Sequence, residues 1–167
     1  QKLKQLSEKT AMHIVMGTGF YKKAWHPDKI EQLSIDDLTR QMVSDIVSGV
    51  NGTAIKAGII GEIPAEDLTL HPQESDEVRV LRAASRAGQL TGAAISLHSH
   101  FRKLPNLHLS VDILEREGSD LSRVVVGHIA TEAISDMAML ESLLQRGVYL
   151  QFDVLGNPWQ MTLADRP

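Results

Sequence analysis

Five short apolar segments alternate with longer amphipathic segments along the chain, and this alternation limits the possible folds more than any other feature. Each apolar segment has the length of a strand. Three are almost continuously apolar, as parallel strands covered on both faces are. The intervening segments repeat apolar residues at helical spacing. The predicted strands are His13–Gly17, Ile55–Ile60, Ala93–His98, Val124–His128 and Val148–Asp153.

The amphipathic segments carry residues that begin and end helices. Ser34 is a good N-cap, Asp37 stands at the third helical position, and Gly49 is a good stop. Glycines end three later segments in the same way. The helices predicted from these signals span residues 34–49, 72–88, 109–118 and 131–147, and one more helix ends near Lys9.

The strict order of helix and strand predicts an α/β fold with a parallel sheet and right-handed crossovers. Two architectures fit this order: a doubly wound open sheet and a (β/α)8 barrel. An open nucleotide-binding sheet would carry a glycine-rich phosphate loop after an early strand. The segment "GTGF" at Gly17 is too short for that motif. The barrel is therefore favoured, and a doubly wound small-molecule binder has little support.

Composition excludes several classes of protein. The 167 residues suffice for one domain with a core, and the chain has no cysteine, so disulfides are absent and a metal would need His, Asp, Glu or a modified Lys. A net charge of −4 argues against nucleic acid as a partner. No apolar run approaches the roughly 20 residues that span a bilayer, and the polar N-terminus does not resemble a secretory signal. A cytoplasmic protein without a membrane partner is expected.

Four of the five predicted strands end in a residue that can bind a metal or transfer a proton: Glu62, His98, His128 and Asp153. The carboxyl ends of parallel strands meet at one edge of the sheet, where side chains from different strands can converge. A lone histidine there is more often structural, but two on different strands with a glutamate on a third favour a metal site. His100 follows His98 by two residues and is interpreted as a loop residue near the site.

The remaining candidates have structural interpretations. Lys56 is expected to be a charge at the beginning of its strand. The other four histidines, at positions 13, 26, 71 and 108, are interpreted as structural or exposed.

Five segments carry a resemblance to a known family: "GTGFY…HPDKI", "IKAGIIGEI", "TGAAISLHSH", "LSRVVVGHI" and "GVYLQFDVLG". In this order and spacing the chain resembles the phosphotriesterase family of the amidohydrolase superfamily, over essentially its whole length. Within the family it is most similar to the branch of phosphotriesterase homology proteins and lactonases. The resemblance implies a (β/α)8 TIM barrel with two divalent metals, zinc or manganese, cobalt or iron, in each complete barrel.

The resemblance also assigns site residues. His98 corresponds to the metal ligand of strand 5, His128 to that of strand 6, and Glu62 to the carboxylate of strand 4 that bridges the metals. A lysine that bridges the metals in other members aligns with Gly61, so the chain is similar to the glutamate-bridged branch. The one-residue offset requires a local adjustment of the backbone. Tyr21 corresponds to a loop tyrosine that reaches over the metals.

Residues 1–167 correspond to about strands 3–7 of the barrel. The resemblance also implies a His-x-His on strand 1 and an Asp on strand 8 that bind one of the two metals, and these have no counterpart in the sequence. The expected domain is therefore a partial barrel, either a piece of a longer protein or a sheet completed by a second chain, and a homodimer is expected.

The resemblance implies a metal-dependent hydrolase in which a metal-bound hydroxide attacks a lactone, a carboxylic ester or a phosphoester, including phosphotriesters. Asp153 is assigned to substrate binding, with a turn or cap as the alternative. Arg102 and Lys103 could neutralise an anionic substrate, although a solvated loop pair is favoured.

The sequence departs from the family at two positions, which concern the proton relay and the selectivity for lactones. The residues "IATE" follow His128, where many members have an Asp, and Val154 stands where lactonases often have an Arg. The alternative function is a catalytically inactive binding or scaffold protein that lacks half of the metal ligands.

Overall fold

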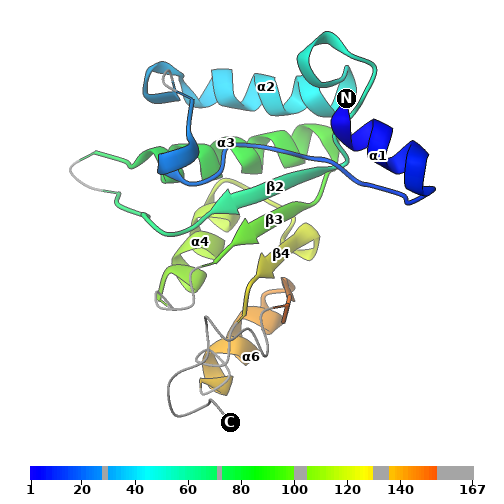
Figure 1. The fold of residues 1–167 in the computed structure, drawn as a ribbon. Coiled ribbons are helices and arrows are strands. Elements are labelled where there is room, and N and C mark those ends of the chain that lie inside the picture. The colour runs from blue at the N-terminus through cyan, green and yellow to red at the C-terminus, as the bar shows by residue number, and fades with distance from the viewer. Residues whose placement is uncertain (28–29, 71–72, 100–104, 130–135, 154–167) are drawn as a thin grey trace.

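The computed structural model describes residues 1–27, 30–70, 73–99, 105–129 and 136–153, and its centre is a five-stranded parallel sheet (Figure 1). The strands lie side by side in sequence order. A doubly wound sheet would reverse this order at a switch point, so the arrangement agrees with the barrel prediction. The strands are β1 (Gly17–Thr18), β2 (Ile59–Pro64), β3 (Ile95–His98), β4 (Val124–Gly127) and β5 (Tyr149–Leu150).

The helices occupy the segments between the strands, as predicted. Ser34 and Asp37 form a capping box, in which each side chain binds the other residue's backbone N–H. The last predicted helix begins at Met137 in the structure, and residues 130–135 lie outside the described part of the chain. The helices are α1 (Lys2–Thr10), α2 (Ile35–Val47), α3 (Asp76–Thr91), α4 (Pro105–Arg116) and α6 (Met137–Gln145), with single 3-10 turns at Lys23–Trp25, Ile30–Gln32, Val50–Gly52 and Leu121–Arg123.

The predicted strand Ile55–Ile60 is placed wrongly, because β2 begins only at Ile59. The backbone of the preceding residues closes a loop instead: the Ile55 carbonyl accepts from Val50 N–H, and Ala57 N–H donates to Asp45. Strand β1 is displaced from its predicted position for the same reason, since its partner in the sheet starts at Ile59. Glu62 therefore lies within β2 and not after it.

Helices α2, α3 and α4 form the layer that covers one face of the sheet (Figure 1). Alternate strand residues point into this layer and are buried, and the apolar stripes of the helices close over them. The fully buried members include Leu38, Met42, Ile60, Ile63, Leu81, Leu97, Val111 and Leu114. Removing one of the larger side chains would cost about 2–5 kcal/mol. In the described part of the chain, no helix is both long and apolar enough to span a bilayer.

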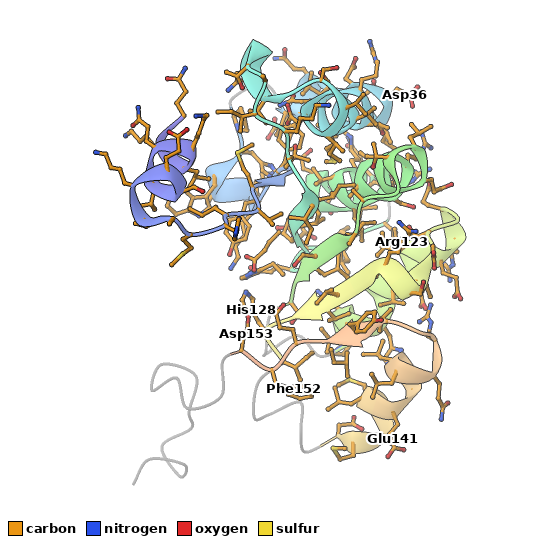
Figure 2. The ribbon with its side chains drawn as sticks, turned by 90° about the vertical axis from the view of Figure 1, so that its right-hand side faces the viewer. Asp36, Arg123, His128, Glu141, Phe152 and Asp153 are labelled. Carbon is orange, nitrogen blue, oxygen red and sulfur yellow. The ribbon has the colours of Figure 1, made fainter. Side chains whose placement is uncertain are left out.

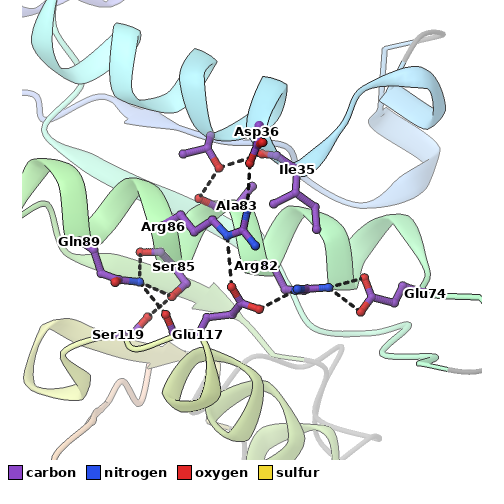
Figure 3. Close-up of polar contacts among 11 residues, drawn as sticks. Ile35, Asp36, Glu74, Arg82, Ala83, Ser85, Arg86, Gln89, Glu117 and Ser119 are labelled. Carbon is purple, nitrogen blue, oxygen red and sulfur yellow. Dashed lines mark hydrogen bonds and ion pairs between the residues drawn. The ribbon is translucent and has the colours of Figure 1, made fainter.

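A network of ion pairs ties these helices together on their outer side (Figure 3). Glu117, just beyond α4, accepts hydrogen bonds from Arg82 Nε at 2.6 Å and from Arg86 Nε at 3.2 Å. Arg82 also pairs with Glu74, and Arg86 reaches Asp36 on α2. Burial alone would raise the pKa of Glu117, but the hydrogen bonds and charges of the two arginines hold it below its usual value.

Replacement of Glu117 by Gln should lower the free energy of unfolding at neutral pH by about 1–2 kcal/mol, because two charge-assisted hydrogen bonds weaken. A carboxyl group with a lowered pKa in the folded state stabilises the protein above its unfolded value of 4.5. That contribution is lost as the pH falls through the folded-state pKa. The difference between wild type and Glu117→Gln, measured by urea unfolding, should therefore shrink towards about pH 3.

The matched control is Glu141→Gln. Glu141 is exposed on α6 and has no ion-pair partner among the described residues. The free energy of unfolding of this variant should equal that of the wild type both at neutral pH and at about pH 3. A stability difference for Glu117→Gln that stays constant on acidification would contradict the assignment of the network.

Candidate metal centre

An irregularity in β2 gives Glu62 its position. Ile60 pairs with Ile95 and Ile63 with Leu97, so β2 contains one residue more than β3 between these two pairs. Such a bulge re-aims the side chains at the extra residue. Ile60 and Ile63 both stay buried under the helices, while the Glu62 side chain remains 41% exposed at the carboxyl edge of the sheet. The bulge thus accounts for the position of Glu62 at this edge.

Gly61 allows the two strands to approach closely at the bulge. A Cβ atom at this position would lie 2.8 Å from both the Cβ and the carbonyl oxygen of Ser96, and φ is 152°. A longer side chain at position 61 would collide with β3. The packing therefore fits glycine at position 61 followed by glutamate.

Glu62, His98 and His128 come together from three neighbouring strands. One carboxylate oxygen of Glu62 lies 3.3 Å from His98 Nδ1, and the other lies 3.2 Å from His128 Nε2. The two imidazole rings meet edge to face with centroids 4.6 Å apart. One ligand atom of each residue lies within 4.8 Å of the others. Two nitrogens and a carboxylate at this separation are a donor set that zinc and similar divalent metals accept.

The protonation of His98 supports the fit of a cation. Burial, followed by the charges of Lys22 and His128, lowers the pKa of His98 and outweighs the opposing effect of Glu62. His98 is therefore neutral at pH 7 and keeps a lone pair available for a metal.

Tyr21 and Lys22 lie beside His98, in the loop after β1. The Tyr21 hydroxyl lies 3.1 Å from His98 Nε2 and 3.2 Å from Nδ1. Burial is the main cause of the raised pKa of Tyr21, which keeps the phenol protonated. Lys22 forms an ion pair with Glu66, and Glu66 Oε1 lies 3.7 Å from His98 Nε2. Burial alone would lower the pKa of Lys22, but Glu66 raises it, so Lys22 is charged.

On the other side of the site, Asp153 contacts His128. Its Oδ1 lies 3.0 Å from His128 Nδ1, and its Oδ2 accepts a hydrogen bond from Gln151 Nε2 at 2.8 Å. Figure 2 shows His128 and Asp153 next to each other at one end of the sheet, with Arg123 near the opposite end. Asp153, predicted to bind substrate, is thus placed against a predicted metal ligand.

Several predicted residues are not brought into this cluster. Arg102, Lys103 and His100 lie outside the described residues, as does His71. His13 is exposed, and His26 and His108 have structural contacts, with the Tyr21 carbonyl and with Ser142 respectively. Lys56 precedes β2, as expected of a charge at the beginning of a strand.

The sequence did not indicate that Lys22, Glu66 and Gln151 lie around the candidate site. The loop that carries Glu66 is held by Glu77, whose carboxylate accepts from Glu66 N–H and Asp67 N–H at 2.8 Å. Asn106 Nδ2 donates to the carbonyls of Ala65 and Glu66. No spacing in the sequence predicts the contacts of Glu77 and Asn106 with this loop, because they join residues that are 10 to 41 positions apart.

The family model of the phosphotriesterase family matches residues 1–166. The chain belongs to the phosphotriesterase family. Among curated relatives, the human N-acetyltaurine hydrolase is 33% identical over 157 residues, which are 94% of this chain and 43% of the relative. The phosphotriesterase homology protein of Escherichia coli is 35% identical over 148 residues, or 89% of this chain and 48% of that protein. The chain thus spans about half the length of the relatives that it matches.

Two solved structures show the same fold. A crystal structure of the Escherichia coli phosphotriesterase homology protein with phosphate in its active site superposes with a TM-score of 0.82 at 32% identity, covering 95% of this chain and 52% of that one. A resiniferatoxin-binding protein from Rhodobacter sphaeroides superposes with a TM-score of 0.81 at 33% identity, covering 93% of this chain and 42% of that one. The five parallel strands therefore form part of the TIM-barrel fold of the family.

Gly61→Ala should destabilise the protein by about 1–3 kcal/mol and weaken its binding of Zn²⁺, because the new methyl group forces β2 away from Ser96 and displaces Glu62. Thermal unfolding and a Zn²⁺ titration measure the two effects. Gly147→Ala is the control, since φ is also positive there but nothing lies within 4 Å of an added Cβ. Equal zinc affinity in both variants would show that the close approach at Gly61 does not set the position of Glu62.

Proposed function

We propose that this member of the phosphotriesterase family is a metal-dependent hydrolase whose metal site includes Glu62, His98 and His128. The observation that supports the proposal most is the position of Glu62, which offers one carboxylate oxygen towards each histidine. Curated relatives named as hydrolases support the reaction class. The proposed metal is zinc or a similar divalent ion, two in a complete barrel, and residues 1–167 would supply five β/α units of that barrel.

The chain's own residues prepare the site for hydrolysis. A divalent metal supplies a Lewis acid that polarises a carbonyl or phosphoryl oxygen and activates water at neutral pH. Glu62 and the two histidines provide negative charge and lone pairs at one point. Tyr21 presents a protonated hydroxyl beside His98 and can donate a hydrogen bond that orients the substrate. Charged Lys22 forms an ion pair with Glu66, and this places a second carboxylate near the same histidine.

The proposed substrates are small molecules with an activated acyl or phosphoryl centre: lactones, carboxylic esters or phosphoesters. Amides belong to the same proposal, because several relatives are named N-acetyltaurine hydrolase. The second candidate is a small-molecule binding protein without turnover. The solved relative described as a resiniferatoxin-binding protein favours this alternative.

Metal binding provides the first test. The purified protein should bind Zn²⁺, and Glu62→Ala, His98→Ala and His128→Ala should each weaken binding by more than about 100-fold, because each removes a ligand. His13→Ala is the matched control, since His13 is exposed and away from the site. Competition with a fluorescent chelator gives the affinities. A wild-type protein that binds no divalent metal would refute the proposed function.

Hydrolysis of a small panel separates the two candidates. The zinc-loaded protein is offered a γ-lactone, an aryl ester, an aryl phosphotriester and N-acetyltaurine. Hydrolysis of at least one compound, lost in His98→Ala and retained in His13→Ala, supports the enzyme. Zinc binding together with saturable binding of a panel compound and no turnover supports the binding protein instead.

A further inference from the structure

His128 is held between two carboxylates on opposite edges of its ring. Nε2 faces Glu62 Oε1 at 3.2 Å, and Nδ1 faces Asp153 Oδ1 at 3.0 Å. In metal sites, a histidine ligand typically donates its second ring N–H to a carboxylate, which fixes both the tautomer and the orientation of the ring. The distance of 3.0 Å from Asp153 Oδ1 to Nδ1 is that of an N–H···O hydrogen bond.

The backbone alone does not favour this orientation of His128. Its φ is 58°, in the left-handed region that a residue with a side chain rarely occupies. The chain turns out of β4 at this residue, so the direction of the ring depends on contacts made by the side chain. Asp153 is the contact on the edge away from Glu62.

Asp153 is itself positioned by its neighbours. Gln151 Nε2 donates to Asp153 Oδ2 at 2.8 Å, which leaves Oδ1 for His128. The backbone of Gln151 is hydrogen-bonded to residues before and after the turn at His128. Its N–H donates to the Val126 carbonyl at 2.9 Å, and its carbonyl accepts from Ile129 N–H at 3.0 Å. These bonds hold the residues after β5 in register with His128.

We propose that Asp153 is a positioning residue that orients His128 for metal binding through the Nδ1–H···Oδ1 hydrogen bond. This inference rests on the proposed metal site. The proton on Nδ1 leaves the Nε2 lone pair directed at Glu62, where the other two candidate ligand atoms converge. In this role Asp153 acts through His128.

The test compares Zn²⁺ affinity in the wild type, Asp153→Asn and Asp153→Ala. Loss of an outer carboxylate typically weakens metal binding by about 10–100-fold. We expect a loss in this range for Asp153→Ala and a smaller one for Asp153→Asn, whose amide oxygen can still accept from Nδ1–H. Substitution with Co²⁺ gives a second readout, because its visible absorption bands should change when the His128 ring rotates. Melting temperatures of the metal-free variants should match the wild type.

Asp112→Asn is the matched control, because it removes a partly exposed carboxylate that pairs with Arg146 far from the site. It should leave the zinc affinity unchanged. If Glu62→Ala loses zinc while both Asp153 variants keep wild-type affinity and Co²⁺ spectra, the positioning role is wrong and the proposed function stands. If the wild type binds no zinc, the proposed function fails and this inference fails with it.

Discussion

The parallel pairing of β2 with β3 is the constraint on which the candidate site depends. One extra residue in β2 separates two pairs that both bury apolar side chains beneath the helices. The hydrophobic layer anchors Ile60 and Ile63 on either side, so the intervening residues bend outwards, towards the edge where the strands end. Packing of apolar side chains on one face of the sheet thereby positions the Glu62 carboxylate at the edge where the strands end. The same logic explains why glycine precedes Glu62, since β3 leaves no room for a side chain there.

Much of the fold follows from periodicity and capping. The order of elements, the capping box at Ser34 and the parallel sheet are confirmed. Strand boundaries were less predictable, because Ile55 is as apolar as a strand residue while its carbonyl closes a loop with Val50. A sequence shows which residues prefer burial, but not which backbone groups are already bonded elsewhere.

The candidate site was predictable only in part, for a related reason. Strand ends in a parallel sheet converge, so Glu62, His98 and His128 could be grouped from their places in the alternation. The residues around them depend on loop geometry. Glu66 reaches His98 because Glu77 and Asn106 hold its loop. Asp153 was recognised as a strand-end acid, but its contact with His128 depends on the turn at that histidine.

Glu62 and His98 lie on β2 and β3, His128 directly follows β4, and each of these strands belongs to a separate β/α unit. A cation held by all three would join units that are otherwise connected by backbone pairing and the helical layer. It would act as a crosslink at the edge of the sheet where the helices do not reach. Amide protons of β3 and β4 would then exchange more slowly in the loaded protein, and the ends of these strands would open together instead of one at a time.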